Sequence, residues 1–246
     1  MAGGQHRPSN DWSQSMLKQL ITASLAALAL TAPAVHAHEA GEIIVRAGAA
    51  NVSPVEDSSR LKVGGAGVPG TQATLNDNTQ LGLTAGYMIT DHIGIELLAA
   101  TPFTHRIGVK GVDAALGVPA GTIDGKFGDT KHLPPTISLQ YYPLDGKSRI
   151  QPYVGAGLNY TWFFDEKLSS RQKANGFSDL KLDNSFGLAL QLGMDVQITD
   201  KLLFNVAVWR MDIDTTATVR HSALGKVKVD VDVDPWVYMV GVGYKF

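Results

Sequence analysis

The chain of 246 residues contains no cysteine, which excludes disulfide bonds, thiolate metal sites and cysteine nucleophiles. Charge is also scarce, because only 18% of the residues are charged, below the roughly 25% usual in soluble domains. Lys and Arg number 21 against 23 Asp and Glu, so no basic excess exists to neutralise a nucleic-acid backbone. The 26 glycines disfavour a helix-rich fold. What remains informative is the order of the residues.

One long hydrophobic run is present, near the N-terminus. It is the Ala- and Leu-rich stretch Leu20–Ala34, followed by Val35 and Ala37 at the −3 and −1 positions of a cleavage site. This layout is typical of a secretory signal, whereas a transmembrane helix needs about 20 apolar residues. We therefore expect residues 1–37 to comprise an upstream extension and a cleavable signal peptide, and residues 38–246 to form the exported domain.

Apolar and polar residues alternate with period two along most of the remaining chain. Every second residue from Trp236 to Phe246 is apolar or aromatic, and the same holds from Phe186 to Ile198. Successive side chains of a strand face opposite sides, so each set forms a continuous apolar face. The pattern predicts eight strands, at about residues 42–54, 76–88, 93–109, 134–142, 150–164, 184–198, 202–219 and 226–246.

The connections between these strands alternate between tight turns and longer polar links. The tight turns are at residues 90–92, 144–149 and 199–201, and the polar links are at about 55–75, 110–133, 165–183 and 220–225. An even strand count with this alternation is typical of an antiparallel up-and-down barrel of the bacterial outer membrane, with short periplasmic turns and long extracellular loops.

The polarity of the two strand faces distinguishes a membrane barrel from a soluble one. One face is bulky and apolar, and the other is rich in Gly, Ala, Gln, Asn and Thr. The interior of an eight-stranded barrel is narrow, so the small face fits inside and the bulky face meets lipid. Aromatic residues at both barrel ends, such as Trp162 and Tyr244, match the expected interfacial girdles. We expect an all-β, eight-stranded transmembrane barrel in the cell outer membrane, surrounded by lipid bilayer and lipopolysaccharide.

Several motifs resemble the outer membrane protein W (OmpW) family and occur in order along the chain. They include His38–Glu42, Glu96–Phe103, His132–Thr136, Met211–Thr216 and Asp234–Phe246. The resemblance implies a narrow apolar lumen that passes small hydrophobic molecules by diffusion, with sideways release through the barrel wall into the membrane. The Leu and Trp that form the family's lumen constriction fall, by matching motifs, on Leu98 and Trp209.

The alternation places both constriction residues on the inward face, because each is out of register with the lipid-facing residues of its strand. Five further bulky residues share inward registers and are expected to line the lumen: Met88, Tyr153, Phe163, Val237 and Met239. The alternative is that these residues simply fill a narrow core.

Pro235 lies where the last strand changes parity, since apolar residues are odd-numbered up to Val233 and even-numbered from Trp236. Proline cannot donate to the strand ladder, so a bulge is predicted near residues 234–235. We hypothesise that this bulge helps to form a lateral exit. The alternative is a bulge without a role in transport.

Other motifs carry little weight. The Gly65-x-Gly67-x-x-Gly70 spacing lacks the strand and helix that a dinucleotide site needs, so it predicts a polar outer loop. Aligned acidic residues at 230, 232 and 234 predict a solvated charge ladder, paired with basic residues across strands, rather than a calcium site.

Three histidines, His105, His132 and His221, fall near the loop end of the barrel, but no motif places a nucleophile beside a base. We therefore expect no enzyme, no metal and no cofactor. The leading interpretation is a passive channel for small hydrophobic solutes. Two alternatives stay open: a structural or receptor barrel with a plugged lumen, displaying loops to phage, bacteriocin or host, and a lipid-modifying enzyme at the loop end. The last strand, ending in Phe246, is expected to engage the barrel-assembly machinery.

Overall fold

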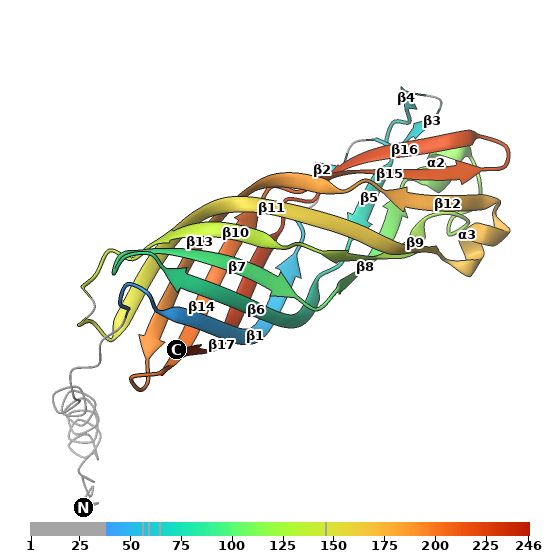
Figure 1. Cartoon of the computed structure of the whole chain (residues 1–246). Helices are drawn as coiled ribbons and strands as arrows, with labels where there is room; N and C mark the ends of the chain where they lie inside the picture. The colour runs from blue at the N-terminus through green and yellow to red at the C-terminus, as the bar shows by residue number, and fades with distance from the viewer. Residues whose placement is uncertain (1–37, 56, 59, 64, 146) are drawn as a thin grey trace, which may run out of the picture. The chain divides into compact units, whose positions relative to one another are not determined.

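The computed structural model describes residues 38–246 except 56, 59, 64 and 146 (Figure 1). The expected extension and signal peptide, residues 1–37, lie outside the described residues. Across the described part of the chain, no helix is long and apolar enough to cross a membrane.

Eight antiparallel strands form a closed barrel. In sheet order they are β1 (Ile43–Ser53), β6 (Asn78–Met88), β7 (Ile93–Ala100), β10 (Thr136–Tyr141), β11 (Ile150–Leu168), β13 (Ser185–Gln197), β14 (Leu202–Met211) and β17 (Trp236–Lys245), which pairs with β1. Closure leaves none of these eight strands with an open edge, as a sheet in hydrocarbon requires. The predicted eight-stranded antiparallel barrel is confirmed.

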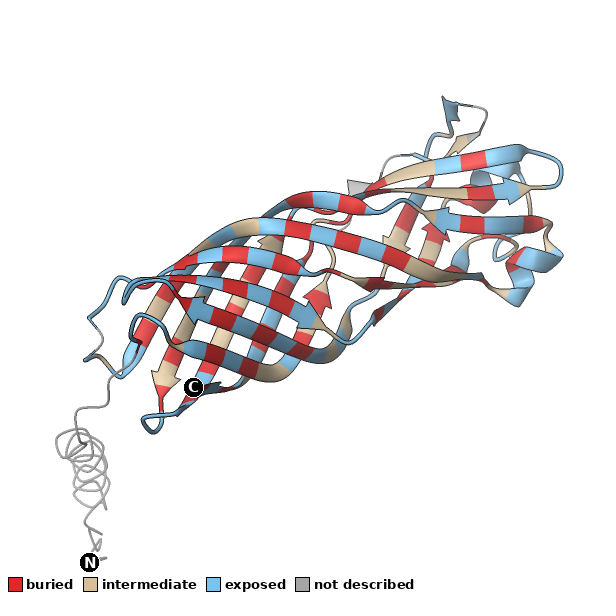
Figure 2. Cartoon of the chain, viewed as in Figure 1, coloured by how far each residue is buried: buried red, intermediate tan, exposed pale blue. Residues whose placement is uncertain are grey.

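Bulky apolar side chains cover the outside of this barrel, and smaller or polar ones fill the inside (Figure 2). In β13, Phe186, Leu188 and Leu190 are 68%, 63% and 62% exposed, whereas the alternate residues Ala189 and Gln191 are buried. The barrel is too narrow for large residues at every inward position. Gly193 makes this clear, since a Cβ there would lie 2.2 Å from Cζ of Tyr153. Glycine at this position thus makes room for one aromatic ring inside the barrel.

Beyond the long-loop end, the chain continues as a second β-structure, the extension (Figure 1). Here β8 (Phe103–Lys110), β9 (Gly125–Leu133) and β5 (Gln72–Leu75) pair beside the outer half of β11. A second sheet contains β12 (Phe177–Leu182), β15 (Asp214–His221), β16 (Gly225–Asp232), β3 (Lys62–Val63) and β4 (Ala66–Gly67), with β2 (Asp57–Ser58) against β16. Two short helices, α2 (Val112–Leu116) and α3 (Ser170–Ala174), complete it.

The predicted long polar links are present at one end of the barrel, and they are more ordered than loops without secondary structure. Much of the chain at 55–75, 110–133 and 165–183 is strand or short helix, and Gly67 itself lies in β4. These segments order because their inward side chains close around a small apolar core, which contains Ile107, Phe127, Leu180 and Val219. The outward residues of β8, such as Thr104 and Arg106, are polar and exposed. The extension therefore lies outside the hydrocarbon region.

Candidate functional site

The seven residues that the sequence assigned to the lumen all lie inside the β-structure and are buried. Five of them belong to one apolar cluster in the outer half of the barrel: Leu98, Phe163, Trp209, Val237 and Met239. The other two, Met88 and Tyr153, belong to a separate cluster with Ile44, Tyr142 and Leu203. The structure thus divides the predicted lining into two groups, and a transport role for either group stays a prediction.

Leu98 and Trp209 approach the same apolar cluster from different strands. Trp209 on β14 pairs with Val237 on β17, and Leu98 on β7 pairs with Thr136 on β10. Leu98 is 4% exposed and Trp209 is 1% exposed. The indole Nε1 of Trp209 has no hydrogen-bond partner among the described residues. Both side chains occupy the barrel interior, and a constriction formed by them stays a prediction.

Below Leu98 and Trp209 the barrel interior is polar, which the sequence pattern did not predict. Arg46 on β1 donates from Nη1 to Oε2 of Glu96 (2.8 Å) and from Nε to Oδ1 of Asp195 (3.0 Å). Its Nη2 donates to the hydroxyl of Tyr142 (3.1 Å) and also to Oδ2 of Asp195. Arg46, Glu96 and Asp195 are each at most 2% exposed. Burial of this arginine is compatible with folding because its charge is paired on two sides.

Uncharged polar residues extend this network across the barrel. Gln191 donates to Glu96 (2.9 Å), and Asn205 donates to Asp195 (2.8 Å) and to the Tyr153 hydroxyl (3.0 Å). We call the set of Arg46, Glu96, Tyr142, Tyr153, Gln191, Asp195 and Asn205 the polar floor. An apolar solute crossing it would have to break charged hydrogen bonds without replacing them, which is costly. The sequence indicated this network only through three charged residues at inward positions of their strands: Arg46, Glu96 and Asp195.

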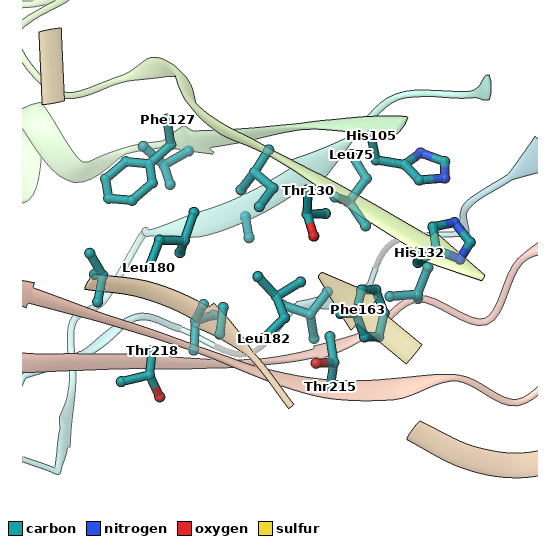
Figure 3. A pocket seen from close by; sticks show the side chains of 18 of the residues that line it. Leu75, His105, Phe127, Thr130, His132, Phe163, Leu180, Leu182, Thr215 and Thr218 are labelled. Atoms are coloured by element: carbon teal, nitrogen blue, oxygen red, sulfur yellow. The ribbon is translucent and has the colours of Figure 1, made fainter. Parts of the chain in front are cut away.

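Above the floor, the extension encloses an apolar cavity, the outer pocket. It is lined by, among others, Leu75, Ile107, Phe127, Leu180, Leu182 and Val229, and it also reaches Phe163 and Pro235 (Figure 3). The space between protein atoms measures about 880 Å³, part of it continuous with solvent. Nearly all of its lining is hydrocarbon, so an oily molecule would find no polar surface to desolvate across most of it.

Two histidines interrupt this apolar lining at one end. The rings of His105 on β8 and His132 on β9 stack with centroids 4.8 Å apart and planes at 24°. Phe103 and Phe163 pack against the His132 ring. Burial lowers the pKa of His132 to about 3, with a further contribution from neighbouring His105. Burial also lowers the pKa of His105. Both rings are therefore neutral at neutral pH.

A second cavity, the mouth pocket, lies at the outer end of the extension. It shares Leu61, Val109 and Phe127 with the outer pocket and has about 470 Å³ of space between atoms, again partly open. Leu116 on α2 and Leu224 in the β15–β16 turn line it, and they are 41% and 38% exposed. Apolar side chains thus continue from the outer surface into the outer pocket.

The barrel wall is interrupted beside the outer pocket. The β7–β10 ladder ends at the Leu98–Thr136 pair, and the β8–β9 ladder begins at Phe103–His132. Between them lie residues 99–102 and 133–135, which we call the wall gap. It contains Pro102, Pro134 and Pro135, and proline has no N–H to give to a ladder. Asn159 instead donates to the carbonyl oxygens of Pro134 (3.2 Å) and Pro135 (3.3 Å).

A groove marks the outer side of the wall gap. Its lining residues are Ala99, Ala100, Leu133, Pro135, Tyr160 and Trp162, and the space between atoms is about 650 Å³, part of it continuous with solvent. Leu98, Phe103 and His132, which bound the gap on the inner side, are buried. The gap therefore separates the barrel interior from a lipid-level groove by only a few side chains.

The segment at Pro235 differs from this gap. Asp234 has a positive φ of 36°, so the backbone deviates locally between β16 and β17. However, the N–H of Met211 donates to Pro235 O (3.2 Å), and the N–H of Val55 donates to Val233 O (3.0 Å). Trp236 then pairs on both sides, with Ser53 and Arg210. The wall at Pro235 is hydrogen-bonded to both neighbouring strands.

The remaining polar candidates do not converge on one site. The Nε2 of His221 lies 3.0 Å from the Asn175 carbonyl, and its ring packs on Phe177. Asp230 pairs with Lys62 at 2.5 Å, and Asp234 pairs with Arg210 at 3.2 Å, as a charge ladder predicts. In the described ranges, one group of three potential metal ligands occurs, formed by Asp212, Asp214 and Asp234. It consists of carboxylates near the surface, one of which is already paired with an arginine.

The closed barrel with a lipid-facing apolar surface and short turns at one end defines a protein of the bacterial outer membrane. The OmpW family model matches residues 39–246, so the chain belongs to the OmpW family. Outer membrane protein W of Vibrio cholerae serotype O1 is 47% identical over 94% of this chain and 100% of that protein. The Escherichia coli K12 protein of the same name is 44% identical over the same shares. The crystal structure of OprG from Pseudomonas aeruginosa has 53% identity and a TM-score of 0.80, covering 85% of this chain and 98% of that one. The predicted family and outer-membrane location are confirmed.

Proposed function

We propose that the protein is a passive outer-membrane channel for small hydrophobic molecules, with release sideways into the membrane. The observation that carries this proposal is the apolar interior, which runs from the outer pocket to Leu98 and Trp209 and stops above the polar floor. An apolar lining lowers the free energy of an oily solute relative to water, and it excludes charged solutes. No energy source is required, because the solute moves down its concentration gradient.

The solute first meets the mouth pocket, where Leu116 and Leu224 are exposed, and then moves past Phe127 into the outer pocket. Leu98 and Trp209 narrow the route below that level, and Phe163 belongs to both the pocket lining and the cluster around them. Met88 and Tyr153 lie at or below the polar floor, so we assign them to closure of the barrel rather than to the solute path.

For the exit we favour the wall gap over the bulge at Pro235. The two segments of the gap share no ladder pair with each other, although each is bonded to its other neighbour. The gap also contains three prolines and has an apolar groove on its lipid side. The wall at Pro235 is bonded to both neighbours, so opening it would cost hydrogen bonds that lipid cannot replace. The polar floor strengthens the argument, because it opposes passage of an apolar solute toward the periplasm.

Two further partners belong to the same proposal. The polar outer surface of the extension would lie among lipopolysaccharide headgroups, since the aromatic residues Tyr160 and Trp162 mark the upper edge of the lipid-facing surface. Phe246, 70% exposed after β17, would be available to the barrel-assembly machinery.

A receptor barrel with a plugged lumen is the second candidate. It is favoured by the burial of Leu98, Trp209 and Met239, each at most 4% exposed and packed in one cluster. In that case the extension would only present its surface to a phage, a bacteriocin or a host, and the outer pocket would have no transported occupant.

Cross-linking the wall gap tests the channel directly, and the absence of native cysteine makes paired cysteines clean probes. Ala100→Cys with Leu133→Cys would be joined by a short bifunctional maleimide, and uptake of N-phenylnaphthylamine by whole cells followed by fluorescence. We expect the cross-linked pair to lose the barrel-dependent uptake. The matched control is Ala156→Cys with Leu190→Cys, which pair across the continuous β11–β13 ladder. Equal uptake in cross-linked and control barrels would exclude this exit. If wild-type barrels, without any cross-link, gave no more uptake than barrel-free cells, the receptor would be favoured.

A further inference from the structure

The hydrogen-bonding groups at the inner end of the outer pocket are unusual for an apolar cavity. His105 and His132 line this end, and Thr130 lies nearer the middle of the pocket (Figure 3). All three side chains are buried. Figure 3 also shows Phe127 and Leu180 at the opposite end of the pocket. The two histidine rings therefore lie together at one end of a mostly apolar cavity, in which single threonine residues, Thr130, Thr215 and Thr218, are spread along the lining.

The protonation of His105 is fixed by its neighbour. Its Nδ1 lies 2.5 Å from the backbone carbonyl oxygen of Asn76. A carbonyl oxygen can only accept, so Nδ1 carries the proton, and Nε2 of the neutral ring keeps its lone pair. The low pKa of His105, caused by burial, keeps the ring in this neutral form at neutral pH. His105 thus offers a hydrogen-bond acceptor with a defined identity.

His132 lacks any hydrogen bond that would explain its burial. Its Nδ1 is buried without a partner among the described residues, and its ring contacts are to Phe103, His105 and Phe163. A buried polar atom without a partner costs free energy, and the cost disappears when a ligand supplies the partner. Phenylalanine would fill the same stack without that cost, so packing alone does not account for histidine at this position.

We propose that the outer pocket selects apolar molecules with a single neutral hydroxyl, phenols and alcohols, and binds the hydroxyl at His105 and His132. The hydroxyl donates to a histidine nitrogen, and the hydrocarbon portion extends toward Phe127 and Leu180. Carboxylates are disfavoured, because neither neutral ring compensates the buried charge. This inference rests on the proposed function, since it names the solutes that the same pocket accepts.

Phenol and toluene form a matched pair of probes, because they differ by a hydroxyl in place of a methyl on the same ring. Their dissociation constants would be measured by equilibrium dialysis against the purified full chain in lipid nanodiscs, with empty nanodiscs subtracted. For each protein, the dissociation constant of toluene is divided by that of phenol. This ratio is then compared between wild type and each variant, so that the difference in hydrophobicity between the two probes cancels. We expect His132→Phe and His105→Phe each to lower this ratio by roughly 3- to 10-fold, the value of one hydrogen bond.

His132→Phe is the cleaner variant, because the new ring keeps the stack between Phe103 and Phe163 and breaks no ladder or side-chain hydrogen bond among the described residues. His92→Phe, in the exposed turn between β6 and β7, is the control and should leave the ratio unchanged. A second readout uses wild type alone: phenol, and not toluene, should shift the ¹⁵N resonances of the His105 and His132 rings.

The outcomes separate the two proposals. Toluene binding that persists in all variants, with a ratio unaffected by His105 and His132, would overturn the hydroxyl selection while leaving the hydrophobic channel intact. Absence of binding of both probes to wild type would overturn the pocket as a solute site, and the hydroxyl selection with it. Absence of phenol-induced ¹⁵N shifts would contradict the inference even if the variants do not fold.

Discussion

Arg46 and Asp195 are 149 positions apart in the sequence, and they form a buried ion pair through two hydrogen bonds inside the barrel. The pair joins β1 to β13 across the lumen, and Glu96 on β7 balances the arginine from a third strand. The guanidinium group of Arg46 therefore connects β1 to β7 and β13, and none of these three strands pairs directly with another.

Removing one partner of this ion pair should destabilise the barrel strongly. We expect Asp195→Asn to lower the free energy of unfolding by about 1.5–3 kcal/mol, because it weakens the charge-assisted hydrogen bonds from Arg46 to Asp195 while Glu96 still balances the arginine. The measurement is urea unfolding of the barrel in lipid vesicles, followed by tryptophan fluorescence. Asp200→Asn, in an exposed turn, is the control and should change little. Equal urea midpoints for the two variants would show that the floor does not stabilise the fold.

Charge at the constriction should stop hydrophobic uptake. Trp209→Glu and Leu98→Glu each place an unpaired carboxylate in the apolar cluster, and we expect uptake to fall by at least about tenfold. Trp209→Phe, which keeps the ring, should retain most of the uptake. Whole-cell uptake of N-phenylnaphthylamine is the measurement, with resistance of the folded barrel to detergent on gels as the check on assembly. Full uptake through an assembled glutamate variant would remove both residues from the solute path.

Replacement of Pro235 should leave uptake unchanged. Pro235→Ala restores an N–H at a position where the wall is already bonded to both neighbours, so the solute path through the wall gap is not altered. Initial uptake rates of the variant and wild type, at equal amounts of assembled barrel, give the comparison. A clear loss in Pro235→Ala would move the exit to the β14–β17 side of the barrel.

The buried His132 predicts acid sensitivity. Burial holds its pKa at about 3 in the folded protein, against an ordinary value of 6.5. Below pH 6.5 the unfolded chain takes up a proton that the folded protein refuses, so stability falls by up to about 1.4 kcal/mol per pH unit until the folded pKa is reached. His132→Phe should therefore lose less stability than wild type between pH 7.5 and pH 4.5, judged by urea midpoints. Equal losses would show that His132 becomes protonated without unfolding.

The barrel could be predicted from the sequence because one physical rule governs it throughout. Each wall strand has a lipid side and a narrow inner side, so period-two alternation gave the strands, the antiparallel order and the orientation of residues such as Leu190 and Gln191. The extension was predicted only in part, because β8, β15 and β16 fall largely within the predicted strands 93–109, 202–219 and 226–246. Its strands β2, β3 and β4 were not predicted, and they have two residues each. Such strands form through pairing with β16 or with each other, which local sequence does not reveal.

The candidate site was predictable only in part, for a similar reason. The inward registers of Leu98 and Trp209 follow from parity, but parity does not reveal that Arg46 meets Glu96 and Asp195 from distant strands. Likewise, Pro102 and Pro135 indicate strand ends, yet only the pairing registers reveal that both interrupt the wall at one level. Depth along the barrel axis depends on strand stagger, which the alternation does not encode.

The polar floor has a consequence for the cell that carries this barrel. Ions and sugars need a continuous column of water, and the paired charges at Arg46 and Asp195 occupy the place where that column would run. We therefore expect a membrane that holds many copies not to become more permeable to ions or water-soluble toxins.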